Sequence, residues 1–66
     1  MDIKSYDINK QECIINFLNV ERKVSFSDNG DIDVEPINDL NEQEEKDLYD
    51  EILNDEEINK LFPYDS

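Results

Sequence analysis

The stretch "ECIINFLNVERKVSFSDNGDIDVE" (Glu12–Glu35) contains three short apolar runs separated by two turn signals. The runs are Glu12–Phe17, Val20–Phe26 and Asp31–Val34, and the second and third alternate apolar with polar residues. Alternation with a period of two is typical of half-buried β-strands. The stretch therefore predicts three strands that follow one another in the sequence.

The two turns predict how these strands pair. "DNG" at residues 28–30 suits a three-residue hairpin loop with Gly30 in the left-handed conformation, and a two-residue turn at residues 18–19 joins the first two strands. This register puts Arg22 opposite Ile15. Opposite residues of antiparallel strands share a face. One face of a three-stranded antiparallel β-meander then carries Cys13, Ile15, Phe17, Val20, Val24, Phe26, Ile32 and Val34.

A helix over Lys10–Leu18 is the alternative to the first strand, because Asn9 could cap it with Glu12 at the third position. The first ten residues are ambiguous, and we expect either a loose arm or a short helix there. Pro36 ends the third strand, since proline has no N–H to donate to a strand ladder.

The C-terminal part predicts helices. Asn41 and Glu44 have the spacing of a capping box, and Leu48, Tyr49, Ile52 and Leu53 form an apolar stripe at helical spacing. Asp55 can cap a second short helix that Pro63 stops. The predicted fold is therefore an α+β domain spanning residues 1–66, a three-stranded antiparallel β-meander packed against one or two C-terminal acidic helices.

The composition excludes several kinds of chemistry. The 66 residues include no His, one Gly and one Cys, so a His-based catalytic site and a Gly-rich phosphate loop are not expected. Cys13 lies in an apolar run and reads as a core residue. The acids of residues 27–35 do not fit a calcium loop, because Gly30 at the sixth position puts Pro36 at the twelfth. We expect no enzyme activity, no metal site and no cofactor.

The charge is concentrated in the second part of the chain. Residues 1–27 hold four acidic and four basic residues, whereas residues 28–66 hold fifteen acidic and two basic ones, which accounts for the whole net charge of −13. Charge asymmetry of this kind is typical of an interaction surface or a solvated tail. Neither a membrane-spanning segment nor a secretory signal is predicted, which favours a cytoplasmic protein.

The acidic residues are the candidate partner-binding site. Like charges three or four residues apart destabilise a helix, and solubility alone needs no such repulsion. A solubilising surface remains the alternative interpretation. The predicted partner-binding residues are Asp31, Asp33, Glu35, Glu44, Asp47, Asp50, Glu51, Asp55, Glu56, Glu57 and Tyr64.

The small size, the strong acidity and a meander followed by acidic helices resemble the phage-encoded nucleic-acid mimics, a group that includes anti-CRISPR proteins, anti-restriction proteins and inhibitors of uracil-DNA glycosylase. The resemblance implies a non-enzymatic inhibitor, acting in host–virus interaction, that occupies the nucleic-acid site of a basic nuclease, polymerase, or repair or restriction enzyme. The absence of a basic face in the sequence argues against direct binding to nucleic acid or to a membrane of anionic lipid. An antitoxin or small regulatory module, a segment that folds on its partner, and a calcium buffer are the alternatives.

Overall fold

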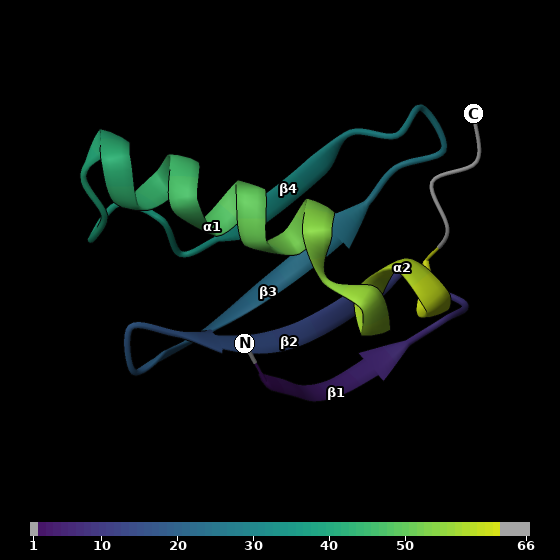
Figure 1. Ribbon diagram of the computed structural model, residues 1–66. Helices are drawn as coiled ribbons and strands as arrows, with labels where there is room; N and C mark the ends of the chain where they lie inside the picture. The colour runs from purple at the N-terminus through teal and green to yellow at the C-terminus, as the bar shows by residue number, and fades with distance from the viewer. Residues whose placement is uncertain (1, 63–66) are drawn as a thin grey trace.

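The structure is a computed structural model that describes residues 2–62. Its sheet is antiparallel, in the order β1-β2-β3-β4, and both helices lie on one face of it (Figure 1). The elements are β1 (Asp2–Asp7), β2 (Glu12–Phe17), β3 (Val20–Phe26), β4 (Ile32–Glu35), α1 (Glu42–Asn54) and α2 (Glu56–Leu61). The α+β class is as predicted, with four strands rather than three.

The predicted meander of β2, β3 and β4 is confirmed in its register. Ser27 N donates to Asp31 O over 2.9 Å, and Gly30 adopts a positive φ of 88° in the loop between them. The pairs Phe17–Val20, Ile15–Arg22, Val24–Val34 and Phe26–Ile32 all form. The alternative helix over Lys10–Leu18 is wrong.

Within the first ten residues, residues 2–7 form strand β1 rather than a loose arm or a helix. β1 pairs with β2 through Ile3–Ile15 and Tyr6–Cys13, and its register shifts between Ile3 and Ser5. The sequence of β1 gives a weak strand signal because an edge strand with one uncovered face needs few apolar residues. The backbone of β2 supplies the pairing that the side chains of β1 do not indicate.

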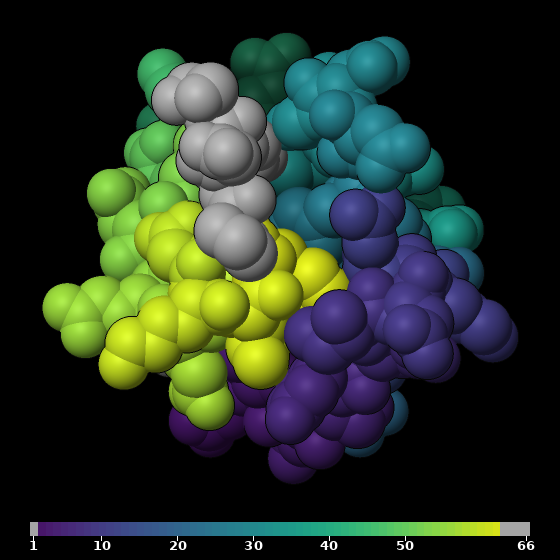
Figure 2. Space-filling view, turned by 90° about the vertical axis from the view of Figure 1, so that its right-hand side faces the viewer, coloured from purple at the N-terminus to yellow at the C-terminus, as the bar shows by residue number. Residues whose placement is uncertain are grey.

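The core lies between the sheet and the two helices. Its buried residues come from β2, β3, β4, α1 and α2, and Phe62 follows directly after α2. They are Cys13, Ile15, Val24, Val34, Leu48, Ile52, Ile58 and Phe62. Phe62 stacks on Phe26 with ring centroids 4.6 Å apart. Figure 2 shows α2 between α1 and the β1–β2 end of the sheet. The prediction that Cys13 is a core residue is confirmed.

The predicted caps divide the acidic segment into two helices. Asn41 Oδ1 accepts from Glu44 N over 2.8 Å, and Glu44 Oε1 accepts from Asn41 N over 3.0 Å, which completes the capping box. Asp55 Oδ1 accepts from Ile58 N over 2.9 Å and caps α2. Within residues 2–62, neither helix is long and apolar enough to cross a membrane. The predicted stop at Pro63 lies outside the described residues.

Candidate partner-binding surface

The outer side of α1 carries exposed carboxylates because Leu48 and Ile52 turn the opposite side of the helix into the core. Asp47, Asp50 and Glu51 are exposed, and Asp47 accepts a hydrogen bond of 3.0 Å from Gln43. On α2, the exposed acids follow the cap. We call the following set the helix surface: Asp47, Asp50, Glu51, Glu56 and Glu57.

Two predicted site residues of the helices have structural roles. Glu44 and Asp55 are half-buried, and each binds a backbone N–H at a helix N-terminus. Their carboxylates stabilise helix ends, since the first N–H groups of a helix have no partner within it. The break at Asp55 also means that residues 42–57 are not one straight acidic rod, as a single continuous helix would have been (Figure 1).

The strand acids lie on the other side of the molecule. In β4, Ile32 and Val34 alternate with Asp33 and Glu35, and Val34 is buried under the helices, so both acids project from the uncovered face. Asp31 is exposed just before β4. The structure therefore does not bring the predicted acids together on one face.

The same alternation applies to β1, β2 and β3 and adds acids that sequence reasoning did not select. The register puts Asp2 opposite Asn16, Asp7 opposite Glu12, and Glu21 opposite Asn16, all on the face away from the core. On β3, the basic residue Lys23 lies on the same face, opposite Glu35 of β4. We call the following acids the open-sheet surface: Asp2, Asp7, Glu12, Glu21, Asp33 and Glu35.

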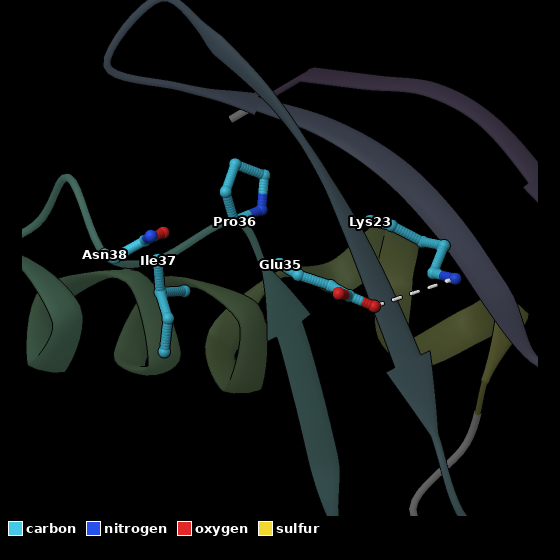
Figure 3. A pocket seen from close by; sticks show the side chains of 5 residues that line it. All are labelled: Lys23, Glu35, Pro36, Ile37 and Asn38. Carbon is cyan, nitrogen blue, oxygen red and sulfur yellow. Dashed lines mark ion pairs between the residues drawn. The ribbon is translucent and has the colours of Figure 1, made fainter.

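Lys23 connects three strands of the open-sheet surface. Its Nζ lies 3.8 Å from Glu35 Oε1 and 3.9 Å from Glu12 Oε2, and all three side chains are partly exposed. Figure 3 shows the Glu35–Lys23 pair beside a wide, shallow depression that Pro36, Ile37 and Asn38 also line. Exposed ion pairs of this kind contribute little to stability, so Lys23 mainly reduces the local negative charge.

Arg22 is the charged residue that the sequence reasoning missed. Its side chain is fully buried beneath the loop that joins β4 to α1. Nη1 and Nη2 donate to the two carboxylate oxygens of Asp39 over 2.8 and 2.9 Å, Nη1 also donates to Pro36 O over 2.6 Å, and Nε and Nη2 donate to Phe17 O over 3.2 and 3.1 Å. These bonds fix the loop from which α1 starts.

The Arg22–Asp39 pair stabilises both charged forms. The hydrogen bond from Arg22 is the main cause that lowers the pKa of Asp39, and the same bond raises the pKa of Arg22 against the opposing effect of burial. The signal in the sequence was the predicted pairing of Arg22 with Ile15. That pairing already placed a guanidinium on the covered face.

Burial also raises two further pKa values. Desolvation, with a smaller contribution from Asp55, raises the pKa of the Cys13 thiol to about 11, so it stays protonated near neutral pH. Desolvation raises the pKa of Tyr49, and the charges of Glu45 and Asp33 raise it further. Tyr49 is thus influenced by the negative charge of one acid on α1 and one acid on β4.

Tyr64, the last of the predicted partner-binding residues, lies outside the described residues. Among residues 2–62, no three His, Cys, Asp or Glu side chains are grouped so that they could hold a metal ion. Comparison of the chain with family models, with curated proteins and with solved structures gave no match. The two acidic surfaces, on the helices and on the open face of the sheet, are the features that bear on function.

Proposed function

We propose that the protein is a non-enzymatic inhibitor whose acidic surfaces occupy the nucleic-acid site of a basic protein. The observation that supports this proposal most strongly is the distribution of charge. Carboxylates project from the helices and from the uncovered face of the sheet, while Arg22, one of six basic residues, is enclosed in the interior. The surface that a partner meets is therefore acidic on both sides.

The charge density of α1 supports a nucleic-acid-like surface. The helix has thirteen residues with six acids and one lysine, hence a net charge of −5, and its length is about 20 Å at 1.5 Å per residue. This is roughly one net charge per 4 Å, and a single nucleic-acid strand carries one per about 3.4 Å. A groove that binds a phosphate backbone offers the complementary charge.

A basic partner gains in two ways from such a surface. The net charge of −13 attracts a positive groove over distance and speeds association, and complementary potentials fix the orientation of the bound protein. Nucleic-acid enzymes are proteins with extended basic grooves. A nuclease, a polymerase, or a repair or restriction enzyme of a host cell is therefore the class of partner that we propose.

The proposal is tested by displacement of a labelled nucleic acid. Purified enzymes of these classes are loaded with a fluorescent duplex or single strand, and the protein is added while anisotropy is followed. We expect the protein to displace the nucleic acid from at least one enzyme at micromolar concentration or below. A triple variant of the helix surface, D47K/D50K/E51K, should lose displacement.

A matched variant separates local from overall charge. The variant E12K/D33K/E35K changes the open-sheet surface by the same total charge and leaves the helix surface intact. Different losses in the two variants would identify the contacting surface. If both variants, folded by circular dichroism, displace the nucleic acid as well as the parent does, the proposal is wrong.

The alternative function, a regulatory module that binds through an apolar patch, has less support in the structure. In the described part of the chain, the large apolar residues that are exposed lie on separate elements, namely β1, the β1–β2 turn, the β2–β3 turn and α1. They are Tyr6, Ile8, Leu18 and Leu53. Single exposed apolar residues are normal on a protein surface and do not make an interface.

A further inference from the structure

β1 is the exposed edge of the sheet. It has six residues, all of them exposed except the half-buried Ile3, and no other element of residues 2–62 lies beyond it (Figure 1). The opposite edge is shorter, because β4 has only four residues. β1 therefore offers an added strand the longer of the two edges.

The register determines which backbone groups of β1 point outward. Phe26 N donates to Gln11 O over 2.9 Å, so the C=O of Gln11 points towards β3 and the N–H of Glu12, on the other side of the same planar peptide, points towards β1. Two-residue alternation then directs the backbone groups of Glu12 and Ile14 towards β1. Their partners are Asp7 and Ser5. The N–H and C=O of Tyr6, between these two residues, therefore point away from the sheet.

The two sides of this edge differ in chemistry. Tyr6 pairs with the core residue Cys13, so its side chain lies on the helix side, where it is 56% exposed. Asp7 and its partner Glu12 lie on the open-sheet side, as does Asp2 near the start of the strand. A strand added here meets an apolar ring on one side and carboxylates on the other.

We infer that β1 accepts an extended segment of the partner, which adds a strand to the sheet and alternates apolar with basic residues. Strand addition at a free edge is a common mode of peptide recognition, in which backbone hydrogen bonds give affinity and alternate side chains give specificity. The inference rests on the proposed function, because a basic partner supplies the basic residues of such a segment.

A second copy of this chain does not fit the same edge. Its β1 would bring another Asp2 and Asp7 towards these acids, and each copy carries a net charge of −13. The register shift at Lys4 also interrupts a regular ladder between two copies. The outward N–H and C=O of Tyr6 lie after that register shift, where a short basic segment can still pair with them.

The test is a nuclear magnetic resonance titration of the ¹⁵N-labelled protein. The probe is a capped seven-residue peptide that alternates lysine and valine, used at about 0.15 M salt to screen exposed charges. We expect the amide shifts to concentrate in β1, with Tyr6 among them. The same peptide with alternate backbone nitrogens methylated should bind at least about fivefold more weakly, because it loses backbone hydrogen bonds and keeps its charge.

A protein variant gives a second reading. Tyr6→Pro removes the outward N–H, and edge strands tolerate proline. Because it also removes the ring, Tyr6→Val is the control. We expect Tyr6→Pro to bind the unmethylated peptide more weakly than Tyr6→Val does, and both variants to bind the methylated peptide equally. If the variant does not fold, the comparison of the two peptides on the parent protein decides.

Equal affinity for both peptides, or shifts confined to α1, would overturn the inference. That outcome leaves the displacement of nucleic acid untouched, since the helix surface can act alone. Conversely, strand addition at β1 without displacement from any enzyme would reject the proposed function and keep the edge as a peptide-binding site. The two experiments thus fail independently.

Discussion

Arg22 shows how a single charged residue can shape both the fold and the surface. Its bonds to Asp39, Pro36 and Phe17 join the loop before α1 to the β2–β3 end of the sheet. All of its buried polar atoms have partners, as do those of the other described residues that are not exposed. A buried charge is stable only under this condition.

Replacing Arg22 should be much more costly than replacing its neighbour Lys23. Arg22→Met leaves Phe17 O and Pro36 O without their donor and removes the ion pair, so we expect a loss of about 3 kcal/mol in the free energy of unfolding. Lys23→Met breaks only exposed pairs and should cost less than about 1 kcal/mol. Urea unfolding measures both, and similar losses would contradict the assigned role of Arg22.

Asp39 should make stability depend on pH in the acid range. Because its pKa is lower in the folded state, its contribution is fully present above the unfolded value of about 3.9 and is lost as the pH falls through the folded value. We expect the stability gap between the parent and Asp39→Asn to be constant from about pH 7 to 5 and to narrow below about pH 4.

Urea midpoints at pH 7, 5 and 3 check this expectation. Asp28→Asn, in the exposed β3–β4 loop, is the control that removes one negative charge without touching Arg22. A gap for Asp39→Asn that is as large at pH 3 as at pH 7 would show that the ion pair is not its source.

Leu18 adopts an unfavourable backbone conformation. It has a φ of 54° in the two-residue turn between β2 and β3, where β-turns of this type prefer asparagine or glycine. Its side chain is 54% exposed, so little burial offsets the strain. We expect Leu18→Asn to raise the free energy of unfolding by roughly 0.5–1 kcal/mol.

Leu53→Asn is the matched control, because Leu53 is 46% exposed but lies in α1. Asparagine is a poorer helix former than leucine, so this variant should be slightly less stable than the parent. Thermal unfolding of the two variants gives the comparison. A lower melting temperature for Leu18→Asn would contradict the account of the turn.

At the scale of elements, the sequence was most informative where two signals agreed. Alternation and turn type together predicted β2, β3, β4 and their register, and cap spacing predicted both helices. β1 was missed because the pairing that holds it comes from β2 and is not visible in its own residues. Its strand signal, "DIKSYD", has one apolar residue on each side of the bulge.

The capping box of α1 should carry measurable stability. Asn41→Ala removes the side chain that accepts from Glu44 N, and we expect a loss of about 1 kcal/mol in the free energy of unfolding. Asn38→Ala, in the preceding exposed loop, is the control and should have little effect. Chemical denaturation gives both values, and equal losses would show that the cap contributes nothing specific.

At the scale of the whole molecule, the sequence predicted that the surface charge is negative but not how it is distributed over the faces of the molecule. The sum of zero over residues 1–27 suggested a neutral N-terminal part. Folding encloses Arg22 and turns Asp2, Asp7 and Glu21 outward, so this part also presents acid. Which acids share a face depends on the position of the helices over the sheet, and no local pattern encodes that position.

The central claim is that negative charge drives binding to a basic nucleic-acid site. It is tested most directly by the dissociation constant of the protein and the enzyme identified by displacement, measured from about 50 to 200 mM salt. We predict that affinity falls at least tenfold over this range, because exposed charges are screened. An affinity that does not change with salt would contradict the account and indicate an apolar interface instead.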